Sequence, residues 1–342
     1  MADVEYGLAL PLGARIGELL EVAAEAERSG YRWLWVNDDR LERDPFTVLA
    51  AIAERTERIR LGPGVTNPYS RHPALIATAI ASLDELSSGR AVLGLGAGGT
   101  NHRALGIERS APAATLREAI GLIRALLAGS SATVDGPVVR AHDARLDFSA
   151  RAELPIYVGS RGPRVLELAG ELADGAIVGN VATREGWTYA TERIAAGAQR
   201  AARDPSEVRL VAWLYTCVDD DEERALDAIR PMAATSLVTS RPVLGELGVE
   251  LPPEFRRAME ACDWSLARSD VERAGRLLPP ELVRRFGLAG TPEACRRRVR
   301  ALLDAFPRIA QVTIVPFAPP GRSAGDTAQR FIHEVPLEAA WS

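Results

Sequence analysis

Short apolar runs alternate with longer stretches of helical periodicity along nearly the whole chain. Between these runs, apolar positions recur every three or four residues; in 74–87, for example, Leu75, Ile76, Ala79, Ile80, Leu83 and Leu86 are predicted to share one buried face. Strand followed by helix, repeated eight times, predicts an α/β fold: a parallel (β/α)8 TIM barrel rather than an open sheet. The runs that we interpret as strands are "YGLALP" (6–11), "YRWLWV" (31–36), "IRLGPGV" (59–65), "AVLGLG" (91–96), "PIYVG" (155–159), "GAIVGN" (175–180), "VRLVAWLYTCV" (208–218) and "QVTIVPF" (311–317).

Two spacings interrupt this rhythm. Residues 129–150 contain two alternating runs around Asp135-Gly136, which predicts a β-hairpin inserted before the fifth strand. Residues 236–308 predict a longer insertion with several helices before the last strand. Insertions at the C-terminal ends of barrel strands build substrate pockets. No linker divides the chain, so we expect 1–342 to form a single TIM-barrel domain.

The composition indicates a soluble globular protein. Of its 342 residues, 47% are hydrophobic and 25% are charged, which argues against disorder. No apolar run is long enough to cross a bilayer, and "MADVEYGLALPL" lacks the features of a signal peptide. The three cysteines, Cys217, Cys262 and Cys295, are too few and too far apart for a disulfide framework. We therefore expect a cytoplasmic protein that has no membrane partner.

Charge and residue usage exclude several function classes. A net charge of −5 disfavours nucleic acid as a partner, because phosphate binding needs a basic footprint. The sequence contains no lysine, which excludes Schiff-base aldolases, pyridoxal phosphate enzymes and Walker A sites. The four histidines lack the spacing of metal ligands, so no metal site is expected.

Two glycine-rich turns are candidate binding elements. "GLGAGG" (94–99) matches G-x-G-x-x-G, but a polar segment separates it from the next helix, which disfavours a nicotinamide cofactor. Its Gly96-Ala97-Gly98 backbone could still approach a phosphate. "GSRGPR" (159–164) follows the fifth strand and places Pro163 at a helix start. Each turn could be an ordinary loop, but together at one barrel mouth they favour an anionic cofactor.

Two further segments carry candidate chemistry. "NDDR" (37–40) places Asp38 and Asp39 at the end of the second strand, so one is expected to face the pocket and the other solvent. A helix-capping role is the alternative. "GPGVTNPYSRHP" (62–73) crowds two glycines and two prolines after the third strand.

Four stretches, in order along the chain, carry a family resemblance. The chain resembles the luciferase-like monooxygenase superfamily, and more closely its coenzyme F420-dependent branch, typified by methylenetetrahydromethanopterin reductase. The first stretch is the most specific. The stretches are "GPGVTNPYSRHPALIATAIASLDELSSGRAVLGLGAG" (62–98), "PIYVGSRGPRVLELAGELADGAIVGN" (155–180), "WLYTCVDDDEERA" (213–225) and "AGTPEACRRRVRALLDA" (289–305).

The resemblance implies a cofactor site. In this family the third strand ends in a non-prolyl cis peptide, here between Gly64 and Val65, that supports the ring of a flavin or deazaflavin. By the same resemblance, Asp38 and Asn67 contact the ring, and Arg103 and Arg164 could meet further negative charge. The residues implied to hold the phosphate are Gly96, Ala97, Gly98, Gly159, Ser160, Arg161 and Gly162.

The resemblance also implies a function, with two departures. It implies hydride transfer between coenzyme F420 and a C=N, C=C or carbinol centre of a small-molecule substrate. The family's first-strand glutamate is replaced by Ala9, and Gly99 stands where the sugar-phosphate dehydrogenases have a glutamate. The predicted proton donors, each with a packing or capping alternative, are Asp39, His72 and Tyr69, followed by Tyr215 and Cys217.

Two other functions stay open from the sequence. One is an FMN-dependent monooxygenase on the same barrel. The other is a barrel that only binds a ligand, because resemblance indicates fold more safely than activity. Members of the superfamily are commonly homodimers, and we expect the same here.

Overall fold

The computed structural model describes residues 4–10, 13–38, 41–98, 102 and 104–336. Its strands are β1 (Glu5–Leu10), β2 (Trp33–Val36), β3 (Arg60–Pro63), β4 (Leu93–Gly96), β5 (Ala132–Asp135), β6 (Arg140–Ala144), β7 (Ile156–Ser160), β8 (Gly175–Gly179), β9 (Arg209–Val218), β10 (Gly287–Gly290) and β11 (Ile309–Pro316). Its helices are α1 (Ile16–Arg28), α2 (Pro45–Ala53), α3 (Pro73–Leu86), α4 (Pro112–Leu127), α5 (Pro163–Leu172), α6 (Arg184–Arg200), α7 (Glu222–Thr239), α8 (Pro253–Glu260), α9 (Arg268–Gly275), α10 (Pro280–Val283), α11 (Pro292–Ala305) and α12 (Ala324–Glu334), with short 3₁₀ turns at Pro205–Glu207 and Arg241–Val243.

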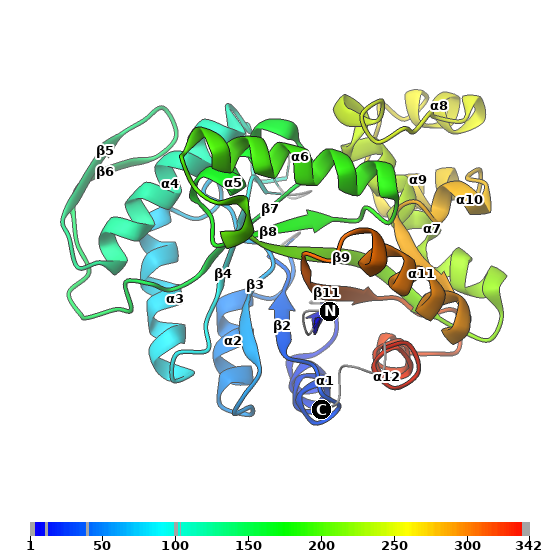
Figure 1. The fold of residues 1–342 in the computed structure, drawn as a ribbon, viewed down its shortest axis with the longest axis horizontal. Coiled ribbons are helices and arrows are strands. Elements are labelled where there is room, and N and C mark those ends of the chain that lie inside the picture. Colours follow the sequence, from blue (N-terminus) through cyan, green and yellow to red (C-terminus); the bar gives the residue numbers. More distant parts are fainter. Residues whose placement is uncertain (1–3, 11–12, 39–40, 99–101, 103, 337–342) are drawn as a thin grey trace.

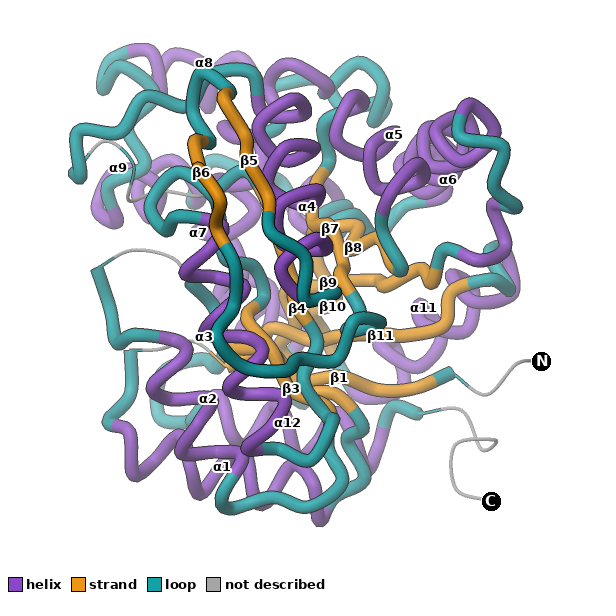
Figure 2. The backbone as a smooth tube through the Cα atoms, turned by 90° about the vertical axis from the view of Figure 1, so that its left-hand side faces the viewer, coloured by secondary structure: helices purple, strands orange, loops and turns teal. Residues whose placement is uncertain are grey.

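The main sheet closes into a barrel. Its strands follow the order β3-β2-β1-β11-β9-β8-β7-β4, and neighbouring strands are parallel. Parallel bridges from Leu61 to Ala91 and from Thr66 to Leu95 join the two ends of this order. Helices surround the strands on the outside (Figures 1 and 2). The eight strands are the eight predicted from the sequence, and the TIM-barrel prediction is confirmed.

Side-chain alternation divides the strands into an inner and an outer face. The outer faces pack against the helices in a large apolar cluster. Both faces are buried, which explains why the strand sequences are almost continuously apolar. The inner faces form a second cluster, composed of Ala9, Trp33, Trp35, Val92, Tyr157, Ile177, Val211, Trp213 and Val315.

The N-terminal end of the barrel interior is closed by a charged group around Trp33. The carboxylate of Glu5 accepts hydrogen bonds of 2.8 Å from Trp33 Nε1 and from Arg209. The guanidinium groups of Arg60 and Arg209 lie 4.8 and 5.8 Å from the Trp33 ring centroid. This plug (Glu5, Trp33, Arg60 and Arg209) leaves the opposite end of the barrel for ligands.

Both predicted interruptions contain the elements expected of them. Strands β5 and β6 form an antiparallel pair, with Asp135 opposite Arg140 (Figure 2). The second interruption begins inside α7, runs through α8, α9 and α10, and ends with α11. It also contains β10, which the sequence did not predict and which pairs with the end of β9.

Helix α3 corrects one prediction about burial. Ile76 and Ile80 are fully buried, as expected, but Leu75 is 67% exposed and Leu86 is 44% exposed. The stripe that faces the sheet is centred on Ile76, Ala77 and Ile80, so Leu75 and Leu86 lie on the outer side. In the described part of the chain, no helix is both long and apolar enough to cross a membrane.

Candidate active site at the barrel mouth

The C-terminal ends of four barrel strands carry most of the predicted site residues. Parallel strands in a closed barrel end at the same rim, which is where TIM-barrel active sites lie. Asp38 follows β2, and residues 64–67 follow β3. Residues 96–98 end β4 or follow it, and residues 159–162 lie at the end of β7 and the turn after it. The fold therefore brings these segments together around one opening.

The Gly64–Val65 peptide is cis, which is the form that the family resemblance implied. The Val65 side chain lies between two glycines, Gly96 and Gly159. A Cβ added at Gly96 would lie 2.6 Å from Val65 Cγ2, and one added at Gly159 would lie 3.0 Å from Val65 Cγ1. Glycines at these two positions leave room for the Val65 side chain, which gives the mouth an apolar wall.

Asp38 is a carboxylate held at the rim. Its Oδ2 accepts hydrogen bonds from Thr66 Oγ1 at 2.6 Å and from Arg71 Nε at 3.1 Å. Arg71 also pairs with Asp44, the N-cap of α2. Burial alone would lower the pKa of Arg71, but the two carboxylates outweigh it and the pKa is raised. Arg71 is thus a fixed cation that links Asp38 to Asp44 beside the third-strand loop.

Asn67 orders the loop in which it lies. Its side chain is fully buried, and its Oδ1 accepts hydrogen bonds from the backbone N–H groups of Tyr69 (3.1 Å) and Ser70 (2.9 Å). His102 Nε2 lies 3.3 Å from the same oxygen. Gly98 has a φ of +83°, and a Cβ there would collide with the His102 ring at 2.2 Å. Sequence reasoning missed His102; its only signal was its position just after the "GAGG" turn.

Two of the predicted proton donors, Tyr69 and His72, are bonded to backbone atoms. The Tyr69 hydroxyl donates to the carbonyl of Ser110, and burial raises the pKa of Tyr69. His72 is the N-cap of α3: its Nδ1 accepts from Ala74 N–H, so Nε2 carries the proton and donates to Arg140 O at 2.7 Å. These bonds favour the capping alternative for His72. Asp39, like Arg103, lies outside the described residues.

The turn after β7 presents a cation. Ser160 Oγ accepts from Gly162 N–H at 2.9 Å, and Pro163 begins α5 as predicted. The Arg161 guanidinium donates only to neutral acceptors in the described part of the chain, where no carboxylate lies within ion-pairing distance. These acceptors are Ser236 Oγ (3.2 Å), Thr239 Oγ1 (2.7 Å) and Gly179 O (3.5 Å). Burial lowers the pKa of Arg161. Arg164 is exposed on α5.

The mouth fits a flat heterocycle with a polar edge and an anionic tail. On the inner face of β2 and just beyond it, Trp35 Nε1 and Asn37 Oδ1 are buried without a hydrogen-bond partner among the described residues. A donor and an acceptor of this kind match the edge of a pyrimidine ring. A Cβ added at Gly179 would meet no atom within 4 Å, so the interior is open there. Arg161 adds a guanidinium at the same mouth, and a guanidinium is suited to binding a phosphate.

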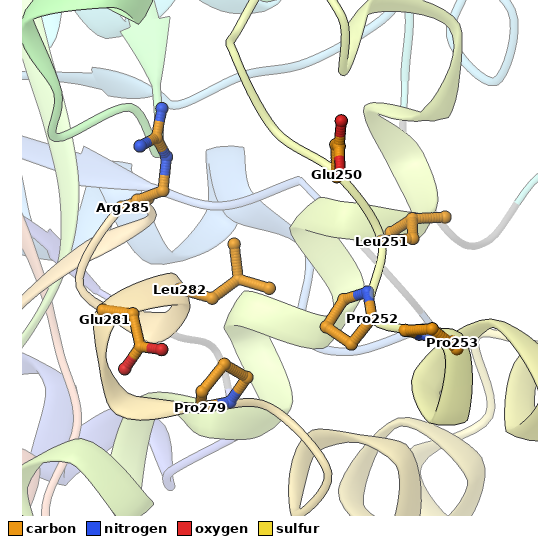
Figure 3. A pocket seen from close by; sticks show the side chains of 8 residues that line it. All are labelled: Glu250, Leu251, Pro252, Pro253, Pro279, Glu281, Leu282 and Arg285. Atoms are coloured by element: carbon orange, nitrogen blue, oxygen red, sulfur yellow. The ribbon is translucent and has the colours of Figure 1, made fainter.

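A separate pocket of about 330 Å³ lies in the insertion before β11 (Figure 3). Its lining comes from the segment that leads into α8 and from α10 with its flanking residues. No barrel strand contributes to it, and the residues predicted from the sequence lie elsewhere. We therefore place the candidate site at the barrel mouth.

Comparisons with known proteins agree with this geometry. A family model described as luciferase-like monooxygenase matches residues 4–308. The chain is 36% identical to a 5,10-methylenetetrahydromethanopterin reductase of Methanolobus tindarius, over 84% of this chain and 87% of that protein. It is 34% identical to an F420-dependent glucose-6-phosphate dehydrogenase of Beutenbergia cavernae, over 71% of this chain and 76% of that protein.

A solved structure shares the whole architecture. The coenzyme F420-dependent tetrahydromethanopterin reductase of Methanopyrus kandleri superposes with a TM-score of 0.83 at 27% identity, covering 98% of this chain and 99% of that chain. The match over residues 4–308 and the 36% identical relative rest on most of the sequence. The chain belongs to the luciferase-like monooxygenase family.

Proposed function

We propose that the protein is a coenzyme F420-dependent oxidoreductase that transfers a hydride between the deazaflavin and a small-molecule substrate. The observation that carries the proposal is the mouth itself: Val65 lies between Gly96 and Gly159, and Arg161 is a cation with no carboxylate partner among the described residues. The F420-dependent names of the Beutenbergia cavernae relative and of the Methanopyrus kandleri structure support the choice of cofactor.

Different residues at the mouth would bind different parts of such a cofactor. Coenzyme F420, when bound, supplies a carbon that gives or takes a hydride. Gly64 and Val65 would form an apolar wall for the ring, and Asp38 would contact its edge. Asn67, which is fully buried, would act by holding the third-strand loop in shape. The phosphate would meet the backbone N–H groups of the two glycine turns and the Arg161 guanidinium. The segments that form these turns are Gly96-Ala97-Gly98 and Gly159-Ser160-Arg161-Gly162.

The substrate has a C=N, C=C or carbinol centre in this proposal. Ala9, fully buried in β1, cannot serve as an acid or base, so the proton must move through another group. Asp39, His72 and Tyr69 remain candidates for that role. Of the two described ones, Tyr69 lies in the loop that Asn67 orders.

Anaerobic titration of the purified protein with F420 and with FMN tests the cofactor. We expect F420 to bind and FMN to bind weakly or not at all. Tight FMN binding without F420 binding would instead support the monooxygenase alternative. Reduced F420 should then be oxidised by a cyclic iminium or an enone, or oxidised F420 reduced by a secondary alcohol. Binding with no turnover on any of the three would favour the barrel that only binds a ligand.

We also propose that residues 1–342 form one domain, that the protein is cytoplasmic and that it forms a homodimer. The outer face of α3 supports the homodimer, because Leu75 and Leu86 are exposed there on either side of Thr78 and Ser82. Both hydroxyls donate to carbonyls of their own helix, and Glu85 is an exposed charge on the same side. Sedimentation of the protein and of Leu75→Glu tests this: we expect a dimer that the substitution weakens.

A further inference from the structure

Two neighbouring helices hold the turn that follows β7. The Tyr189 hydroxyl, on α6, donates to the backbone carbonyl of Arg161 at 3.2 Å. The Arg161 side chain extends to α7, where its guanidinium donates to Ser236 Oγ at 3.2 Å and to Thr239 Oγ1 at 2.7 Å. The main chain of Arg161 is therefore held by α6 and its side chain by α7.

The two hydroxyls on α7 are well placed to fix a guanidinium. Ser236 and Thr239 are three positions apart, so they lie on the same side of the helix. Thr239 Oγ1 donates its own hydrogen to the carbonyl of Thr235 at 2.9 Å, a common bond for a threonine in a helix. Its lone pairs are thus left to accept from Arg161. Ser236 is fully buried, which keeps water from taking the place of the arginine.

These bonds use only part of the Arg161 guanidinium. An arginine has one N–H on Nε and two on each Nη. Nη1 donates to Ser236 and, at 3.5 Å, to the carbonyl of Gly179, and Nη2 donates to Thr239. Among the described residues, this leaves the N–H of Nε and one N–H of Nη2 unused. They lie side by side on one edge of the guanidinium plane, and such an edge pairs with two oxygens of a phosphate.

The same bonds place the guanidinium at the barrel mouth. Gly179 is the last residue of β8, the strand that pairs with β7 in the barrel. A Cβ added at Gly179 would meet no atom within 4 Å. The Arg161 guanidinium is therefore held at the rim of the barrel, next to open space.

We propose that Ser236 and Thr239 are positioning residues, which hold Arg161 so that its Nε–Nη2 edge meets two oxygens of the cofactor phosphate; the inference rests on the proposed F420-dependent function. An arginine side chain without such bonds samples many rotamers, and ordering it on binding costs affinity. A carboxylate in their place would compete with the phosphate for the cation, whereas hydroxyls leave the charge available. The predicted insertion 236–308, which begins at Ser236, thereby contributes to the cofactor site.

Anaerobic titration with two deazaflavins tests this proposal. One is F420, and the other is the deazariboflavin that has the same ring and ribityl chain but no phosphate. In the double variant Ser236→Ala with Thr239→Val, we expect the Kd for F420 to rise about tenfold. The Kd for the phosphate-free compound should stay within about twofold. General damage to the fold would weaken the binding of both compounds, so the ratio of the two Kd values reports on the phosphate contact.

Thr235→Val with Ser240→Ala is the matched control. Thr235 Oγ1 also donates to the carbonyl four residues earlier, at 3.0 Å, and Ser240 is as buried as Ser236. The control removes the same atoms from the same helix but leaves both bonds to Arg161 in place. We expect both Kd values to stay within about twofold of the wild type. Thr239→Ser, which keeps the hydroxyl, should also bind F420 as the wild type does.

Two results with F420 would overturn the proposal. The first is a Kd for F420 that is unchanged or lower in the double variant, or that rises equally for both deazaflavins. The second concerns Arg161→Lys, which keeps the charge but has no paired N–H edge. If this variant binds F420 as tightly as the wild type, the contact with two phosphate oxygens is wrong.

Failure of the proposed function gives a different result. If the wild type binds neither deazaflavin, the F420 function fails, and the same comparison is made with FMN and riboflavin. A rise in Kd that is confined to FMN in the double variant would then support the positioning role, and the lack of such a rise would overturn it. A wild type that binds none of the four compounds would overturn both proposals.

Discussion

The Trp213 ring lies against the backbone of Gly64 on the opposite wall of the barrel. A Cβ at Gly64 would come within 2.7 Å of Trp213 Cη2 and 2.9 Å of Trp35 Cβ. Two tryptophans from β2 and β9 therefore exclude any side chain from this position. The contact fixes how deep the mouth is, because the indoles form its floor.

Gly64→Ala is expected to destabilise the protein. Overpacking a filled interior costs about 1 to 3 kcal/mol, so urea denaturation should show a free energy of unfolding lower by that amount. Gly179→Ala is the matched control, because its Cβ would meet nothing within 4 Å. We expect its stability to stay within about 0.5 kcal/mol of the wild type. Equal losses in the two variants would contradict the packing described for Gly64.

Arg161→Gln is expected to weaken cofactor binding. A charge-assisted hydrogen bond contributes about 1.5 to 3 kcal/mol, which corresponds to a roughly tenfold or greater rise in the Kd for F420. Arg200→Gln, which removes an exposed arginine paired with Glu167 and Glu171 on the outside of the barrel, serves as the control. Binding is measured by absorbance titration under anaerobic conditions. Similar Kd values for the wild type and Arg161→Gln would remove Arg161 from the proposed phosphate site.

Asp38→Asn is expected to loosen the third-strand loop. The substitution replaces the anion that accepts from Thr66 and Arg71 with a neutral amide, which should cost about 1 to 3 kcal/mol of stability. Asp135→Asn changes a carboxylate that is 78% exposed and should have little effect. Hydrogen exchange at residues 66–70 gives a local reading. If the amide protection of residues 66–70 is unchanged in Asp38→Asn, the order of this loop does not depend on the Asp38 carboxylate.

Two buried thiols predict a loss of stability in alkali. Burial raises the pKa of Cys217 to about 11 and that of Cys295 to about 12, whereas an unfolded cysteine ionises near 8.5. Above roughly pH 8.5 the folded state therefore holds more protons than the unfolded state, and the free energy of unfolding falls as pH rises. Urea denaturation at pH 7 and at about pH 9.5 checks the sign.

The same thiols should resist alkylation until the protein unfolds. Cys262, which is only partly buried, is expected to react first in the native protein. Mass spectrometry after a short iodoacetamide exposure identifies the modified residue. Rapid native labelling of Cys217 would contradict its placement in the outer cluster.

The sequence was sufficient for the barrel because the strands are almost continuously apolar and many of the connections between elements carry glycine or proline. It could not predict β10: the segment "GLAG" has neither alternation nor β-branched residues, and it is a strand only because β9 extends beyond the barrel to pair with it. The exposure of Leu75 was missed for a related reason, since periodicity finds an apolar stripe but not its centre.

The sequence predicted which segments form the candidate site, but not the side-chain contacts within it. The segments after β2, β4 and β7 were identified because parallel strands end together, and the residues after β3 were identified from the family resemblance. The bond from His72 to Arg140 O and the approach of His102 to Asn67 are tertiary contacts between residues far apart in the sequence, and no spacing rule predicts them. The hairpin that supplies Arg140 was predicted, but its attachment to the start of α3 was not.

The plug of Glu5, Trp33, Arg60 and Arg209 leaves the barrel interior with one entrance, at the C-terminal ends of the strands. A ligand cannot pass through the base, so cofactor and substrate must enter and depart by the same route, and the one lying deeper can leave only after the other. A barrel with one entrance therefore imposes an order on ligand binding and release. The rate of turnover then depends on the residence time of the ligand that lies nearer the entrance.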